Sequence, residues 1–162
     1  MRIGQGFDAH RLVPGRPLVL GGIQIPSERG LEGHSDGDVL LHAVTSALLG
    51  ALGEGDLGRH FPSSDPALAG IPSRAIVERV AGLVRAAGLA IGNVDATVVA
   101  EAPRLAPYLG KMQAAIADAL GSDPAHVNVK ATSTDGLGAI GRGEGIAALA
   151  VALLVPAEQA SR

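Results

Sequence analysis

The chain has 162 residues, no cysteine and a formal net charge of −3, and 47% of its residues are hydrophobic. This length suits a single domain over residues 1–162, and the lack of cysteine excludes disulfides and thiolate metal sites and favours a cytoplasmic setting. With aromatic residues at 2% and no basic excess, the composition excludes a nucleic-acid surface, and neither a signal peptide nor a membrane-spanning run is recognisable.

The first predicted element is a strand over residues 2–13, which carries the stretch GFDAHRLV. Because side chains alternate between the two faces of a strand, Asp8 and His10 are expected to project from the same face. A hairpin over residues 16–26, turning at Gly21–Gly22, is predicted to follow.

A buried helix is predicted over residues 38–52, because this run is apolar on nearly every side and is followed by Gly53. The polar segment 27–37 before it is expected to be a loop. Ser35 or Asp36 is expected to cap the helix.

The rest of the chain alternates between helical and extended patterns. The predicted elements are a loop over 56–72, a helix over 73–87, a strand over 94–102, a helix from Pro107 to Gly121, a strand over 126–134 and a strand over 145–155. This order predicts the α+β class, with a single sheet and helices packed on one of its faces.

A histidine lies among the leucines of the first helix, at position 42. Taken alone, His42 would be a satisfied core residue, and Asp8 with His10 a hydrogen-bonded surface pair. Taken together, two imidazoles and one carboxylate without a fourth protein ligand match the open zinc sites that enzymes use for catalysis. A structural zinc site would need a closed set of four ligands.

The loop GHSDGD leads directly into that helix. Ser35-x-x-Asp38 is similar to a capping box, and the free amides of a helix N-terminus attract anions. His34 could donate a proton or a hydrogen bond to a phosphate. The alternative is that Ser35 and Asp38 only cap the helix.

The segment TSTDGLGAIGRGEG contains a formal G-x-G-x-x-G pattern. A dinucleotide site is excluded, because no helical pattern follows these glycines and no later strand could supply a ribose-binding acid. The hydroxyls of residues 132–134 suit phosphate oxygens, although ordinary turn residues are an equal alternative. Arg142 and Glu144 are spaced to pair with each other.

Four further residues give weaker signals. Asp56 and Gly58 could bind the hydroxyls of a polyol or form a plain turn. His60 and His126 have no evident partner, so both are expected to be solvated loop residues.

Five motifs occur in order: Asp8-x-His10, GHSDGDVLLHA, GDLGRHFPSSDP, AEAPRLAPY and NVKATSTDGLGAIGRGEGIA. With them the chain resembles the 2-C-methyl-D-erythritol 2,4-cyclodiphosphate synthase family of the non-mevalonate route to isoprenoid precursors. The resemblance extends from the first predicted strand to the last. It implies a homotrimer with active sites between neighbouring subunits.

The implied reaction is that of a phosphorus–oxygen lyase. The substrate is 4-diphosphocytidyl-2-C-methyl-D-erythritol 2-phosphate, whose 2-phosphate attacks its own β-phosphate and expels CMP. The resemblance implies Zn²⁺, or another divalent transition metal, on Asp8, His10 and His42. It also implies Mg²⁺ or Mn²⁺ at the diphosphate, with help from Asp135.

The resemblance assigns His34 and Ser133 to catalysis, Asp56 and Gly58 to the hydroxyls of the substrate, and residues 100–106 with 131–134 of the adjacent subunit to cytidine. It also implies a cavity on the trimer axis lined by Phe7, Ala139 and Arg142. The full set of implied substrate-binding residues is Asp8, His10, His34, Ser35, Asp56, Gly58, Phe61, Pro62, Ser63, Ser64, Asp65, Ala100, Glu101, Ala102, Pro103, Arg104, Leu105, Ala106, Thr132, Ser133, Thr134, Asp135 and Arg142.

Two other functions are compatible with a metal triad. A zinc-dependent phosphoester hydrolase would use the metal to activate water, but no general base is evident beside the triad. A non-enzymatic, oligomeric ligand-binding protein would use the metal only to join sheet and helix, and the missing fourth ligand argues against it.

Overall fold

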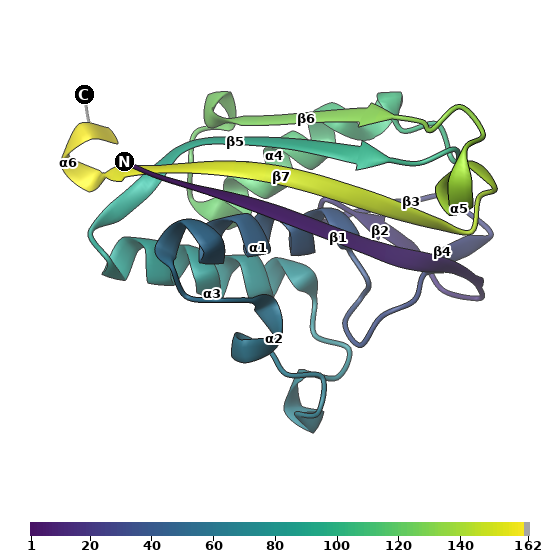
Figure 1. The fold of residues 1–162 in the computed structure, drawn as a ribbon, viewed down its shortest axis with the longest axis horizontal. Helices are drawn as coiled ribbons and strands as arrows, with labels where there is room; N and C mark the ends of the chain where they lie inside the picture. Colours follow the sequence, from purple (N-terminus) through teal and green to yellow (C-terminus); the bar gives the residue numbers. More distant parts are fainter. Residues whose placement is uncertain (161–162) are drawn as a thin grey trace.

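A five-stranded sheet with helices on one side forms the molecule (Figure 1), and the predicted α+β class is confirmed. The computed structural model describes residues 1–160, so the last two residues of the predicted domain lie outside the described residues. The strand order is β4-β1-β7-β5-β6, with β5 and β6 parallel and the other pairs antiparallel. Its strands are β1 (Arg2–Pro14), β4 (Arg29–Leu31), β5 (Leu89–Val99), β6 (Val127–Thr132) and β7 (Gly145–Pro156).

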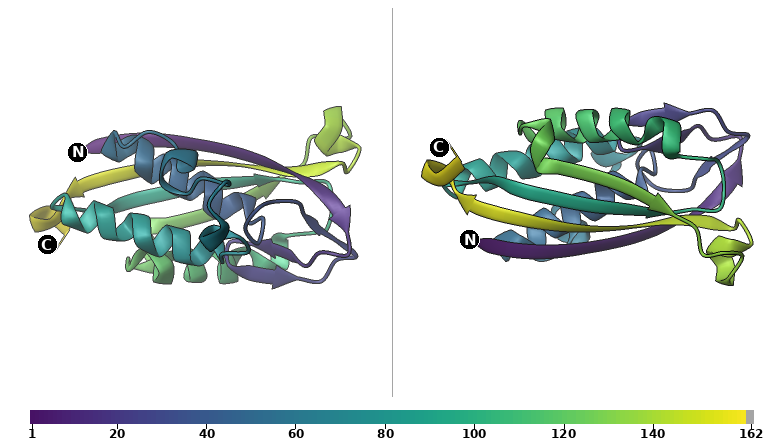
Figure 2. Two further views of the ribbon diagram at one scale, coloured as in Figure 1. Left: turned by 90° about the horizontal axis from the view of Figure 1, so that it is seen from below. Right: turned by 90° about the horizontal axis from the view of Figure 1, so that it is seen from above.

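Three long helices cover one face of this sheet, as the two views of Figure 2 show. They are α1 (Val39–Leu52), α3 (Ser73–Ala86) and α4 (Leu109–Leu120). Helix α1 packs on β1 and β7, α4 packs on β6, and α3 fills the space between them. The shorter helices are α2 (Leu57–His60), α5 (Gly138–Gly141), α6 (Ala157–Ala160), η1 (Pro66–Leu68), η2 (Ala106–Tyr108) and η3 (Pro124–His126).

The prediction of a single sheet is wrong in one respect. The predicted hairpin forms, but its strands β2 (Leu18–Leu20) and β3 (Ile23–Ile25) make a separate two-stranded sheet. The segment 27–37 is also not entirely a loop, because β4 pairs with the end of β1. A three-residue strand is too short to show alternation, so only its partner reveals it.

Several predicted bounds also shift. Strand β5 begins at Leu89 rather than at residue 94, and the predicted loop over 56–72 contains α2 and η1. Each follows a capping aspartate, Asp56 or Asp65, and η1 begins at Pro66, and residues of these types also predict turns. The segment 145–155, ambiguous by periodicity, is strand β7 as predicted.

Helix α1 is capped by Asp38 rather than by Ser35 or Asp36. The fully buried Asp38 carboxylate accepts the Leu41 amide at 3.0 Å and the amides of Gly21 and Gly22 at 2.9 and 2.7 Å. One carboxylate therefore caps α1 and fixes the β2–β3 turn beside it. Gly53, at a φ of 78°, ends the helix as predicted.

Burial raises the pKa of Asp38 to about 6, although the amides of Gly22, Leu41 and Gly21 oppose the shift. The folded state therefore holds the Asp38 proton to higher pH than the unfolded chain does, and stability is lost as pH rises between about 4 and 6. We expect the unfolding free energy of the wild type to fall by about 3 kcal/mol more than that of Asp38→Asn across this interval. Urea denaturation of both proteins at pH 4 and pH 7 measures this change. An equal change in the unfolding free energy of the two proteins between these pH values would contradict it.

Two glycines set the distance between β1 and α1. A Cβ on Gly4 would lie 2.0 Å from the Ala47 carbonyl oxygen, and one on Gly6 would lie 2.0 Å from the Ala43 oxygen. The strand backbone therefore touches the helix backbone. Asp8 and His10, on the same face of β1 as these glycines, are consequently directed toward α1.

Candidate active site

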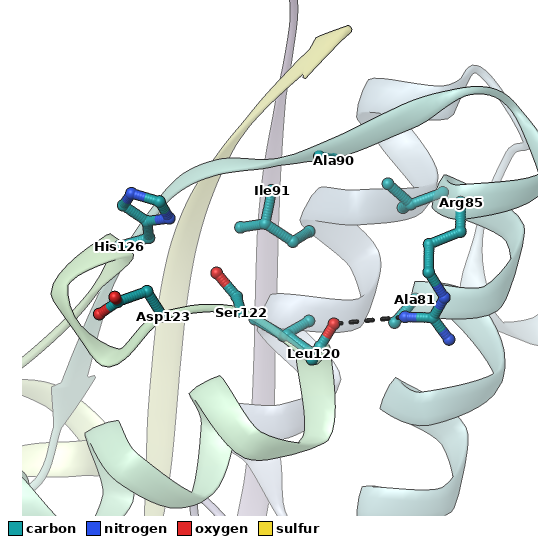
Figure 3. A pocket seen from close by; sticks show the side chains of 10 residues that line it. Ala81, Arg85, Ala90, Ile91, Leu120, Ser122, Asp123 and His126 are labelled. Carbon is teal, nitrogen blue, oxygen red and sulfur yellow. Dashed lines mark hydrogen bonds between the residues drawn. The ribbon is translucent and has the colours of Figure 1, made fainter. Parts of the chain in front are cut away.

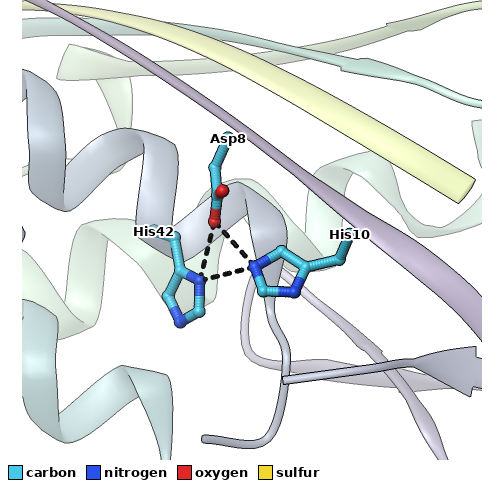
Figure 4. A group of neighbouring side chains, drawn as sticks. All are labelled: Asp8, His10 and His42. Carbon is cyan, nitrogen blue, oxygen red and sulfur yellow. Dashed lines mark hydrogen bonds and ion pairs between the residues drawn. The ribbon is translucent and has the colours of Figure 1, made fainter. Parts of the chain in front are cut away.

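Asp8, His10 and His42 meet where β1 passes over α1 (Figure 4). Asp8 Oδ2 lies 2.8 Å from His10 Nε2 and 2.9 Å from His42 Nδ1, and the two ring nitrogens are 3.2 Å apart. The predicted convergence of the three side chains is therefore confirmed.

The charge of this group is set by its own contacts. Burial opposes ionisation of Asp8, but hydrogen bonds from His10 and His42 hold the pKa of its carboxyl well below the usual range. The hydrogen bond to Asp8 raises the pKa of His10. A carboxylate that is ionised at neutral pH is the form that binds a cation.

The donor set fits a divalent transition metal. One carboxylate oxygen and two imidazole nitrogens converge, and in residues 1–160 this is the one group of three such side chains close enough to share an ion. His10 also contacts the Glu32 carbonyl through Nδ1, and His42 Nε2 lies 3.0 Å from both the Ser35 and Ser73 hydroxyls. These outer contacts fix the orientation of both rings.

A cavity of about 290 Å³ opens beside the triad. The candidates His34, Ser35, Gly58, Phe61 and Ser63 line it. Four apolar lining residues were missed by the sequence analysis: Leu57, Leu68, Ile71 and Ile76. Leu57 lies inside a quoted motif, whereas Ile76 was read only as part of the apolar stripe of α3.

Four neighbouring candidates are not among the lining residues of this cavity: Asp56, Pro62, Ser64 and Asp65. Asp56 caps α2 by accepting the Arg59 amide, and Asp65 caps η1 by accepting the Ala67 amide, both at 2.9 Å. They therefore shape the wall of the cavity in this chain.

A second hollow, of about 300 Å³, lies between the loop after β5 and the end of β6. Its lining residues are Ala100, Glu101, Pro103, Arg104, Leu105, Ala106, Ala131, Thr132 and Ser133. The predicted cytidine segments thus lie together, although Ala102 and Thr134 do not line the hollow. The two hollows share no residue, so the two sets of candidates are separate on one chain.

The turn after β6 is held by a carboxylate. Glu101 Oε1 accepts the Thr134 and Gly136 amides at 2.9 and 3.2 Å, and Ser133 donates to Asp135 at 3.0 Å. The four-residue helix α5 contains two of the three glycines, and the next element after the last of them is a strand. The antiparallel β7 that follows pairs with β5 and β1, so no dinucleotide-binding unit forms.

Arg142 lies apart from the triad. Its guanidinium pairs with Glu144 at 2.6 Å, as their spacing suggested. It lines a third hollow with Arg11 and Arg29. None of these residues lines the cavity at the triad.

A further cavity, of about 320 Å³, lies where α3, α4 and β5 come together (Figure 3). Arg85 donates to the Leu120 carbonyl at 3.4 Å at the end of α4, and His126 lies on the other side of the cavity. His126 is half-buried rather than fully solvated. His60 also has a partner, because its ring contacts the Glu54 carbonyl at 3.0 Å.

No helix among residues 1–160 combines the length and apolar character needed to cross a bilayer. This agrees with the absence of a membrane-spanning run in the sequence.

Comparison with known proteins gives the same assignment as the motifs. A 2-C-methyl-D-erythritol 2,4-cyclodiphosphate synthase from Geotalea daltonii is 60% identical over 154 residues, covering 95% of this chain and 90% of that protein. The CDP complex of IspF from Plasmodium falciparum superposes with a TM-score of 0.84 at 32% identity, covering 96% of each chain. The bifunctional IspDF from Campylobacter jejuni gives a TM-score of 0.91 at 42% identity, over 94% of this chain and 42% of that one. The model of the YgbB family matches residues 1–155, and the chain therefore belongs to that family.

Proposed function

We propose that this chain converts 4-diphosphocytidyl-2-C-methyl-D-erythritol 2-phosphate to 2-C-methyl-D-erythritol 2,4-cyclodiphosphate and CMP. An oxygen of the 2-phosphate bonds to the β-phosphorus, and the bond from that phosphorus to the bridging oxygen breaks. The electron pair leaves on the α-phosphate of CMP. The observation that carries the proposal is the triad at the mouth of a cavity, in a chain 60% identical to a protein of this name.

The residues suit a reaction between two phosphates. Both groups are negative, so catalysis requires positioning and electrostatic stabilisation. A divalent ion on Asp8, His10 and His42 would supply a Lewis acid and a template for the β-phosphate. The apolar wall of the cavity restricts water, which would otherwise compete with the 2-phosphate as nucleophile.

The roles of the polar residues follow from their positions. His34 and Ser35 line the cavity beside the triad, where they can donate to the methylerythritol phosphate. The Ser133 hydroxyl lines the second hollow and donates to the Asp135 carboxylate beside it. A Mg²⁺ or Mn²⁺ at Asp135 would neutralise charge on the diphosphate. Backbone groups of residues 100–106 would form hydrogen bonds with the cytosine base.

The proposal includes a homotrimer in which the cytidine hollow of one subunit completes the triad cavity of its neighbour. Two observations support it. The two hollows share no residue on one chain, and the sheet face opposite the helices exposes apolar side chains. On adjacent β1 and β7 these are Ile3, Phe7, Leu149 and Val151, which are 41–72% exposed. A cluster of exposed apolar side chains of this kind is typical of an interface.

We expect Val151→Lys to be predominantly monomeric and inactive, because an unpaired charge would be buried between subunits. Light scattering coupled to size exclusion measures the mass. Leu83→Lys is the control, since Leu83 is 40% exposed on α3 and outside this face. A trimeric Val151→Lys protein, or a monomeric and active wild type, would contradict the proposed interface.

The proposal also treats residues 1–162 as one domain in a cytoplasmic setting, which a single shared core and a chain without cysteine support. A zinc-dependent phosphoester hydrolase is not favoured, because the relatives are named as cyclodiphosphate synthases.

Incubation with the diphosphocytidyl substrate, followed by phosphorus NMR, tests the reaction. The expected products are CMP and a cyclic diphosphate in equal amounts. A linear bisphosphate in place of the cyclic product would show that water is the nucleophile and would overturn the proposal.

A further inference from the structure

Behind His42, on the side away from Asp8 and His10, lies a chain of buried polar groups. His42 Nε2 is 3.0 Å from Ser73 Oγ, and Ser73 Oγ is 2.5 Å from Asp36 Oδ1. Ser73 has no exposed surface and does not line the triad cavity. It cannot touch the substrate, so any role in the reaction acts through His42.

The hydrogen bonds that link Asp36, Ser73 and His42 have one consistent set of donors and acceptors. The Asp36 carboxylate only accepts, so the Ser73 hydroxyl donates its proton to Asp36. The Ser73 oxygen can then only accept a hydrogen bond from His42. For the contact with Ser73, His42 must carry its proton on Nε2 and donate it, so the lone pair of Nδ1 is the one left to bind a cation. The Ser35 hydroxyl, also 3.0 Å from Nε2, is then a second acceptor of that proton.

Helix capping does not account for these contacts. Asp36 Oδ2 accepts the backbone amide of Ser73 at 2.9 Å, and this bond alone would cap α3. The second oxygen, Oδ1, accepts the Ser73 hydroxyl and the Asp38 amide. Capping of α3 therefore does not require a hydroxyl at position 73. The contact that does require it is the one between the Ser73 oxygen and His42 Nε2.

We propose that Ser73 and Asp36 are positioning residues, which hold the ring of His42 with Nε2 protonated and Nδ1 directed at the divalent ion. The inference rests on the metal site of the proposed function. Groups that hold a ligating histidine in this way commonly change metal affinity by about 10- to 100-fold when removed.

The test is the zinc dissociation constant of Ser73→Ala, measured by competition with a chromophoric chelator. We expect the affinity to fall at least tenfold, with a melting temperature close to that of the wild type. Asp36 still accepts the Ser73 amide in this variant, so α3 remains capped. In the zinc-loaded protein, the Nε2 proton of His42 should exchange with water faster than in the wild type by NMR.

Two further variants sharpen the comparison. Thr45→Val removes another buried hydroxyl of α1, which donates to the Leu41 carbonyl, and should leave zinc affinity unchanged. Ser35→Ala combined with Ser73→Ala removes both hydroxyls within reach of His42 Nε2 and should weaken zinc binding more than Ser73→Ala does.

The outcomes distinguish a failure of the proposed metal site from a failure of the positioning role of Ser73 and Asp36. A wild type that binds no zinc overturns the proposed metal site and this inference with it. Zinc bound by Ser73→Ala and by the double variant as tightly as by the wild type overturns the inference alone. If Ser73→Ala does not fold, Ser73→Cys keeps the volume and weakens the hydrogen bond, and it should shift affinity in the same direction.

Discussion

His42→Ala should abolish zinc binding and lower turnover by at least about 10³-fold while leaving a folded protein. The substitution removes one of three ligands, and a metal that stabilises phosphoryl charge contributes several kcal/mol to the transition state. Zinc content by atomic absorption and product formation by phosphorus NMR measure the two effects. The fold should persist, because α1 is held by a large apolar core to which His42 does not belong.

His126→Ala is the matched control, because it removes another imidazole that is partly buried and far from the triad in sequence. It should retain both zinc and activity. Full turnover in a His42→Ala protein without zinc would contradict the metal-centred account.

Gly6→Ala should lower the free energy of unfolding by about 3 kcal/mol or more and should also weaken zinc binding. The added Cβ would lie 2.0 Å from the Ala43 carbonyl oxygen and 2.7 Å from the Ala47 amide nitrogen. Both atoms belong to the backbone, so α1 must move away from β1. That movement separates His42 from Asp8 and His10.

Urea denaturation and chelator competition measure the two effects. Gly50→Ala is the control, because a Cβ there would meet nothing closer than 3.7 Å and Ala favours the helix. Gly50→Ala should be at least as stable as the wild type. A Gly6→Ala protein with unchanged stability would show that the contact between β1 and α1 is not as tight as the structure describes.

Much of the fold follows from local patterns in the sequence. Strand β1 and helix α1 are long runs with clear ends, so the sequence predicts both to within a few residues. Strand β4 is not predicted, because a strand of three residues depends on pairing rather than on its own pattern. The β2–β3 hairpin is predicted, but its separation from the main sheet is not. The sequence predicts the cap of α1 at Ser35 or Asp36, with Asp38 only as part of a capping box. The structure has the cap at Asp38, whose carboxylate also binds the distant amides of Gly21 and Gly22.

The candidate site divides in a similar way. The period of a strand predicts that Asp8 and His10 share a face, but bringing His42 to them requires the close backbone packing at Gly6. Ser73 gave no signal, because a serine at the start of a helix is ordinary. Its contacts to His42 and Asp36 arise from packing between segments more than 30 residues apart.

X-ray absorption at the zinc edge, on protein purified and loaded with zinc, tests the central claim most directly. The account predicts one zinc per chain, bound by two imidazole nitrogens and one carboxylate oxygen at about 2.0–2.2 Å, with the remaining position filled by a non-protein ligand. The His42→Ala variant should lose this signal. A fourth protein ligand in the spectrum, or the same spectrum from His42→Ala, would contradict the account.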